Sequence, residues 1–99
     1  MVHCRASHLH AGILHTGILL EFRGDLDMAS APRTHRCLMD AAESGDFVIV
    51  DLTKVEYIDD SGLYALEAAL RESRQLGRDF IMIAAPRSAV RRALESAGS

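Results

Sequence analysis

The chain has 99 residues, of which 48% are hydrophobic and 25% are charged, and its formal net charge at pH 7 is -3. This balance is typical of one globular domain with a modest core and excludes a disordered or fibrous chain. The acidic charge argues against nucleic acid or an anionic membrane as the main partner, because both need a positive surface. A chain of this size has little room for a deep catalytic cleft, so we expect a function on the surface.

The amino-terminal part of the chain predicts an edge strand and no membrane span. Residues 2–10 are expected to pair with the following strand through a turn at His10-Ala11-Gly12. The longest apolar stretch, 11–20, is interrupted by His15 and Thr16, whereas a membrane span needs about 20 apolar residues. The sequence therefore predicts a cytoplasmic protein.

The two cysteines, Cys4 and Cys37, lie far apart in the sequence and have no metal-type spacing. Two cysteines are too few for a disulfide scaffold, so both are predicted to be reduced thiols.

Three short apolar runs predict further strands at residues 18–22, 47–52 and 80–84. The last two runs are almost continuously apolar, which is typical of strands in a parallel sheet covered on both faces. Helical periodicity follows each run, over residues 30–44, 61–77 and 86–98. The alternation predicts an α/β fold, with helices packed on a single-layer, mixed but largely parallel sheet of about four strands.

The junction Asp59-Asp60-Ser61-Gly62 connects a buried strand to the best amphipathic helix. Free backbone N–H groups and the helix dipole favour anions at such a helix start, and glycine allows close backbone approach. A simple helix cap by Asp60 or Ser61 is the commoner explanation of these residue types. A serine here could also receive a phosphate beside two carboxylates.

A second acidic turn, Gly24-Asp25-Leu26-Asp27, follows the strand at 18–22. Taken alone, it is an ordinary strand-to-helix turn with a capping acid. In a parallel sheet, however, the loops after the strands gather at one edge. This geometry predicts that Asp27 lies near Ser61.

Together, Gly24 to Asp27, the run at 48–52, and Ile58-Asp59-Asp60-Ser61-Gly62-Leu63 resemble the ordered signature of a STAS domain. The chain is most similar to the anti-sigma factor antagonists of that family, over residues 17–98. The resemblance implies one STAS-like domain over residues 1–99. Because the sequence ends at Ser99, that domain is expected to lack the carboxyl-terminal strand and helix of many relatives.

The resemblance also implies a function. In the antagonist family, the unphosphorylated protein binds a serine-kinase anti-sigma factor and frees the sigma factor, and phosphorylation of a serine breaks the complex. Ser61 occupies the position of that serine. The expected docking patch comprises Asp27, Asp59, Asp60, Gly62 and Leu63. Expected partners are the kinase, a serine phosphatase and a second copy of the chain, with transcription regulated indirectly.

Asp60 departs from the family pattern, because a serine is common at this position. Its permanent charge could weaken the kinase complex, imitate part of the phosphorylated state, or have no effect within a helix cap. The sequence leaves these three alternatives open.

Other functions have weaker support in the sequence. The five histidines form no metal-binding motif, and no histidine is expected beside Ser61 to act as its base, so no metal, cofactor or enzymatic activity is predicted. A receiver domain with Asp51 as phosphate acceptor lacks the early acidic pair and the late lysine that its resemblance requires. A basic helix face with Arg87, Arg91 and Arg92 is more simply a solvated surface.

One alternative function remains open after these exclusions. In it, the same surface belongs to a constitutive scaffold in a stressosome-like or transporter-associated complex.

Overall fold

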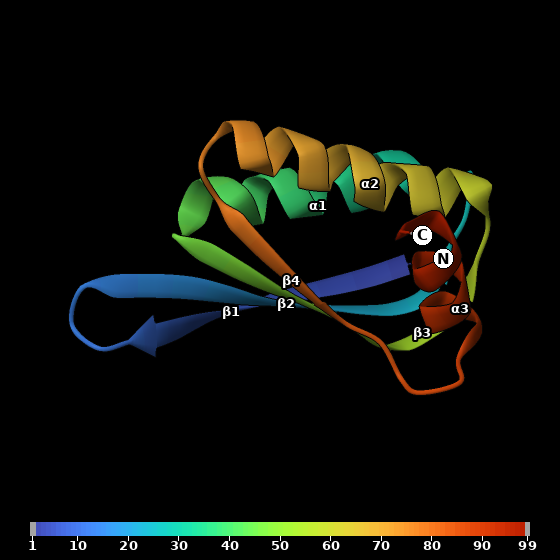
Figure 1. Ribbon diagram of the computed structural model, residues 1–99, viewed down its shortest axis with the longest axis horizontal. Coiled ribbons are helices and arrows are strands. Elements are labelled where there is room, and N and C mark those ends of the chain that lie inside the picture. Colours follow the sequence, from blue (N-terminus) through green and yellow to red (C-terminus); the bar gives the residue numbers. More distant parts are fainter. Residues whose placement is uncertain (1, 99) are drawn as a thin grey trace.

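A computed structural model describes residues 2–98 and contains a single sheet with three helices. The elements in chain order are β1 (Val2–Ala11), β2 (His15–Leu26), α1 (Ala31–Ser44), β3 (Phe47–Ile58), α2 (Asp60–Gln75), β4 (Asp79–Ile83) and α3 (Ala89–Gly98). The strand order is β1-β2-β3-β4, with β1 antiparallel to β2 and the other pairs parallel (Figure 1). The predicted α/β class, the mostly parallel sheet and the amino-terminal edge strand are confirmed.

The helices and one face of the sheet enclose the core. Figure 1 shows α1 and α2 side by side over the sheet, with α3 at one end. Leu38 of α1, Leu66 of α2 and Val90 of α3 belong to the same buried cluster, so all three helices contribute to this layer. The strands supply the alternate side chains of that cluster, among them Ile18, Leu20, Phe22, Val48, Val50 and Leu52.

The opposite face of the sheet carries no helix from the described part of the chain. Register places Leu19 beside Ile49 and Ile49 beside Ile81 on this face. The side chain of Ile81 is 53% exposed, and that of Ile83 is 44% exposed. The prediction that the apolar strands are covered on both faces is therefore wrong. Their apolar character continues onto an open surface, which we call the open face.

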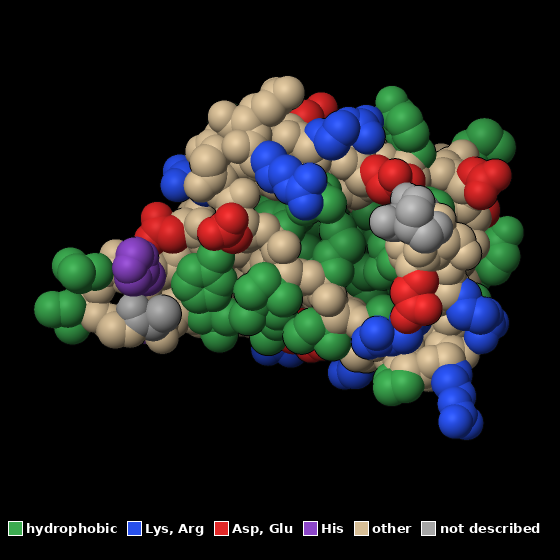
Figure 2. All heavy atoms as spheres, viewed as in Figure 1, with side chains coloured by type: hydrophobic (Ala, Val, Ile, Leu, Met, Phe, Trp, Pro, Cys, Tyr) green, Lys and Arg blue, Asp and Glu red, His purple; other side chains and the backbone are tan. Residues whose placement is uncertain are grey.

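A hollow of about 390 Å³ lies between α2, β4 and α3. Figure 2 shows hydrophobic side chains gathered between the helical layer and the β4 side of the sheet. The apolar residues that line the hollow are Leu66, Leu70, Met82, Ala84 and Leu94.

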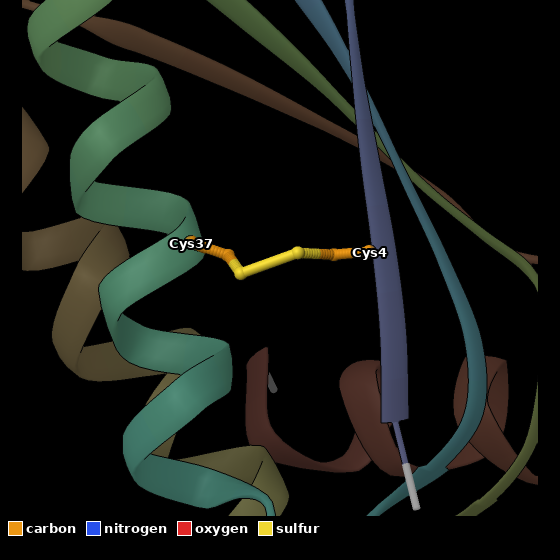
Figure 3. Close-up of a disulfide and its surroundings, with 2 residues drawn as sticks. All are labelled: Cys4 and Cys37. Atoms are coloured by element: carbon orange, nitrogen blue, oxygen red, sulfur yellow. A yellow bond between two sulfur atoms is a disulfide. The ribbon is translucent and has the colours of Figure 1, made fainter.

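Cys4 and Cys37 form a disulfide that connects β1 to α1 (Figure 3). Their Cα atoms are 7.1 Å apart. The prediction of two reduced thiols is wrong because sequence separation says nothing about contact across the fold. Cys4 and Cys37 both pack against the buried cluster, and α1 lies over that side of the sheet.

Candidate functional site

The candidate site lies where β2 and β3 end at one edge of the sheet. The backbone N–H of Asp59 donates a hydrogen bond to the carbonyl of Leu26 at 3.1 Å. The backbone N–H of Met28 donates to Oδ2 of Asp59 at 3.2 Å. The two acidic loops are thus hydrogen-bonded to each other, which confirms the prediction that they gather at the same edge.

Asp59 is the N-cap of α2. Its Oδ1 accepts a hydrogen bond from the backbone N–H of Gly62 at 2.9 Å, and its carbonyl accepts one from the N–H of Leu63, also at 2.9 Å. These bonds satisfy N–H groups that have no partner within the first turn of a helix. The cap is Asp59, not Asp60 or Ser61 as the simple interpretation had it, and both carboxylate oxygens of Asp59 are engaged.

Gly62 is buried at the closest approach of α2 to β2. A Cβ atom built on Gly62 would overlap the carbonyl group of Leu26. The absence of a side chain therefore lets the first turn of α2 lie against the end of the strand. This contact holds the start of α2, which includes Ser61, against the end of β2.

Asp27 closes its own turn instead of facing the start of α2. Its Oδ1 accepts a hydrogen bond from the N–H of Ser30 at 3.0 Å, and the Ser30 Oγ accepts one from the N–H of Asp27 at the same distance. The bond from the Ser30 backbone is the main cause that holds the pKa of Asp27 below its ordinary value. Asp27 thus remains ionised and shapes the loop that precedes α1.

The side chains of Asp60 and Ser61 take part neither in the cap of α2 nor in the turn before α1. Asp60 is exposed in the first turn of α2, and Ser61 is half-buried. Neither side chain makes a hydrogen bond or ion pair within the described residues. The hydroxyl of Ser61 is therefore available for chemistry, whereas the carboxylate of Asp59 is not.

Both residues line a groove between α1 and α2 with a volume of about 590 Å³. Its exposed apolar members include Met28, whose side chain is 75% exposed, and Tyr64, which is 65% exposed. At the far end, Nε2 of His35 lies 2.7 Å from Oε2 of Glu72. The full lining is Met28, Ala31, Pro32, His35, Asp60, Ser61, Tyr64, Ala65, Ala68 and Glu72.

Three members of this groove, Met28, Tyr64 and His35, were not predicted as site residues from the sequence. Tyr64 had a detectable signal, because it lies three residues after Ser61 and therefore on the same side of the helix. Met28 also had a signal, because it follows Asp27, which was predicted to lie near Ser61. His35 had none, since its place in the groove depends on how α1 packs against α2.

The site combines the hydroxyl of Ser61 with a groove that has exposed apolar side chains. Among residues 2–98 no group of three or more His, Cys, Asp or Glu is placed to hold a metal ion. A hydroxyl that makes no hydrogen bond to the described residues, at a helix start beside a groove with exposed apolar side chains, can be modified and can contact a partner. Fold and site together define a small α/β domain with a serine hydroxyl at the start of α2, beside a groove between α1 and α2.

The family follows from comparison with known proteins. The model of the STAS domain matches residues 10–99, so the chain belongs to the STAS domain family. STAS domains of this fold are typically binding domains without enzymatic activity. No curated protein sequence matches the chain significantly.

Solved structures share this fold. An anti-sigma factor antagonist from Mycobacterium paratuberculosis is 21% identical, with a TM-score of 0.74 over 97% of this chain and 79% of that one. Unphosphorylated SpoIIAA, also an anti-sigma factor antagonist, is 16% identical, with a TM-score of 0.69 over 95% and 81%. The phosphorylated form of SpoIIAA, a cell fate determinant of Bacillus, gives 15% and 0.64 over 93% and 84%.

A longer structure, named Mglu, is also similar, with 20% identity and a TM-score of 0.66. The match covers 83% of this chain but only 20% of Mglu, so this chain spans a small part of that protein. At these identities the likeness establishes the fold alone. Within residues 2–98, each helix is too short or too polar to traverse a lipid bilayer.

Proposed function

We propose that the protein is an anti-sigma factor antagonist that binds a serine-kinase anti-sigma factor and is released when the kinase phosphorylates Ser61. One observation carries the proposal. Ser61 is the one residue of the Asp59 to Gly62 junction that combines a hydroxyl, a position at the groove and no hydrogen bond to the described residues. The existence of a phosphorylated form of the similar protein SpoIIAA supports it.

The proposed docking patch comprises the groove and the start of α2. Met28 and Tyr64 supply exposed apolar contact area, and aromatic and methionine side chains are enriched in protein interfaces. Asp59 and Gly62 act by positioning, because their own groups hold the start of the helix. Asp27 positions the loop that carries Met28, and Leu63 continues the same first turn.

The proposed switch is electrostatic. A phosphate on Ser61 would add a charge of about -1.5 to -2 next to the exposed carboxylate of Asp60. Like-charge repulsion and the cost of removing the phosphate from water would both oppose the complex. The unphosphorylated protein binds, and the phosphorylated protein does not.

The remaining partners and the location belong to the same proposal. A serine phosphatase would restore the binding form, transcription would be regulated through the released sigma factor, and the protein would work in the cytoplasm as a single STAS-like domain. Disulfides are uncommon in cytosolic proteins. Labelling of Cys4 and Cys37 by a thiol reagent in intact cells would support the cytoplasm, and absence of labelling would contradict it.

The test uses an anti-sigma factor kinase recovered from the native host by co-purification. With ATP, the kinase should add one phosphate to the protein, and mass spectrometry should map it to Ser61. Ser61→Ala should bind the kinase and take no phosphate, whereas Ser61→Glu should bind at least about tenfold more weakly.

Ser44→Ala is the matched control, because the Ser44 hydroxyl is exposed but donates to the carbonyl of Asp40. It should leave phosphorylation and binding unchanged. Phosphate at another residue would overturn the assignment of Ser61. Equal binding by Ser61→Ala and Ser61→Glu would instead indicate a constitutive scaffold. Asp60→Ser, which restores the common family residue, then measures the effect of the extra charge.

A further inference from the structure

The open face of the sheet contains a second hollow, which the proposed antagonist function does not use. Its volume is about 480 Å³, within the range of small-molecule sites. It extends over β1, β2 and β3. The lining residues are His3, Cys4, Arg5, Glu21, Phe22, Arg23 and Lys54.

Strand register brings basic side chains from three strands into one row. His3 of β1 is the partner of Arg23 on β2, and Arg23 is the partner of Lys54 on β3. Adjacent strands lie about 4.8 Å apart, so like charges in such a row repel. Arg5 lies in the next row, opposite Glu21.

A bulge in β3 puts Lys54 in this row. The register runs from the pair Glu21 and Asp51 directly to the pair Arg23 and Lys54, so β3 has one extra residue, Thr53. Oδ1 of Asp51 accepts hydrogen bonds from the N–H of Thr53 at 2.9 Å and from its hydroxyl at 2.6 Å. These bonds hold the extra residue, and bulges commonly redirect side chains in this way.

Burial along β3 agrees with the change of direction. Leu52 and Val55 are both buried, although they are three positions apart, and the two residues between them are exposed. A regular strand would place residues 52 and 55 on opposite faces. The bulge therefore turns Lys54 toward the open face and returns Val55 to the core.

The positive charges of the hollow outnumber its negative charge. Arg5, Arg23 and Lys54 form no ion pair with any described residue, and Glu21 is the single carboxylate in the lining. This local excess of positive charge occurs in a chain whose net charge is -3. Two arginines and a lysine around one concavity match a phosphate group, which arginine binds through paired N–H donors.

We propose that this hollow binds a small molecule that carries a phosphate group, with Arg23 and Lys54 as the principal contacts. Arg5 adds a third cation, and the carboxylate of Glu21 limits the affinity. The site lies on the face of the sheet opposite to α1 and α2, so its occupation does not depend on Ser61 or on the proposed kinase.

Inorganic phosphate is the first probe, titrated into the full chain in a phosphate-free buffer of constant ionic strength and followed by ¹H–¹⁵N spectra. Saturable shifts should concentrate on the amides of β1, β2 and β3 around the hollow. The double variant Arg23→Gln/Lys54→Gln should weaken binding by about tenfold or more. Its spectrum also reports whether the fold is retained.

Arg33→Gln/Arg36→Gln is the matched control, because it removes the same charge from exposed positions on α1. It should leave the affinity for phosphate within about twofold of the parent. Equal weakening by both double variants, or shifts that do not saturate, would overturn the proposal in favour of non-specific attraction.

Glu21→Gln provides a test of opposite sign. Removing the one carboxylate from the lining should strengthen phosphate binding, and unchanged or weaker binding would contradict the proposed geometry. Phosphatidylcholine vesicles with and without phosphatidic acid distinguish the source of the phosphate. Binding to phosphatidic acid without any response to inorganic phosphate would assign the same side chains to a lipid headgroup and overturn the small-molecule site.

Discussion

The two faces of the sheet use similar strand residues for different purposes. On the covered face, side chains such as Leu20 and Val50 are almost fully buried beneath the helices. On the open face, apolar side chains such as Ile81 remain half exposed, and a row of basic residues crosses β1, β2 and β3. The covered face therefore contributes most of the stability. The open face can carry charged side chains that have no buried partner.

The two proposed binding sites lie in different layers of the molecule. The groove next to Ser61 belongs to the helical layer, and its geometry depends on the packing of α1 against α2. The basic hollow belongs to the open face, and its geometry depends on strand register and one bulge. Substitutions that disturb one site should therefore leave the other intact.

The largest expected effect on stability comes from the disulfide on the covered face. Cys4→Ser opens a loop whose ends are 33 residues apart in the sequence, and loss of that restraint on the unfolded chain should cost about 4 kcal/mol. Chemical denaturation of the oxidised protein and the variant measures this difference. Reductant should destabilise the parent protein and leave the variant unchanged.

A direct count of thiols decides the same prediction independently. The oxidised, unfolded parent should react with no thiol reagent, because Cys4 and Cys37 are its only cysteines. Two reactive thiols in protein purified without reductant would contradict the disulfide.

A pair of alanine substitutions compares the two faces themselves. Leu20→Ala on β2 removes a side chain that is 2% exposed and should lower the free energy of unfolding by about 3 kcal/mol. Ile81→Ala on β4 removes one that is 53% exposed, so its cost should stay below about 1 kcal/mol. A comparable loss in both variants, measured by urea denaturation, would show that something covers the open face in solution.

The sequence could predict the elements but not the difference between the faces. Continuous apolar runs at 47–52 and 80–84 indicated strands correctly, yet the same residues fit one covered face or two. The exposure of Ile81 and Ile83 depends on which face of the sheet the helices cover, and the hydrophobicity of the residues alone does not predict that face. The bulge at Thr53 and the disulfide likewise depend on contacts that form only in the folded chain.

The candidate site was predictable to a similar extent. Parallel strands end at one edge, so the meeting of the two acidic loops followed from the fold class. Which acid is engaged did not follow, because Asp59 and Asp60 are identical in chemistry and adjacent in sequence. Only the start of α2 distinguishes them, by turning Asp59 toward Gly62 and leaving Asp60 exposed.

Alanine substitutions at these two acids test that distinction with a smaller effect. Asp59→Ala should lower the free energy of unfolding by about 1 to 2 kcal/mol, because it removes the cap of α2 and the bond to Met28. Asp60→Ala should change it by less than about 0.5 kcal/mol, as is usual at exposed positions. Thermal and urea denaturation measure both, and a reversed order would assign the cap to Asp60.

The smallest expected effect is the pH dependence of stability that comes from Asp27, in the turn between β2 and α1. Hydrogen bonding from Ser30 lowers the pKa of Asp27 in the folded protein, so the carboxylate form stabilises the fold. That contribution is complete above the pKa of the unfolded chain, about 3.9, and is lost as the pH falls through the lower folded pKa.

Asp27→Asn keeps an acceptor for Ser30 but removes the charge, and so isolates this contribution. The parent should be slightly more stable than the variant at neutral pH, and the difference should shrink as the solution is acidified below about pH 4. Carboxyl carbon shifts from NMR should give Asp27 a titration midpoint below the ordinary aspartate value. A raised midpoint, or a stability difference that grows in acid, would mean that the carboxylate does not hold the turn before α1.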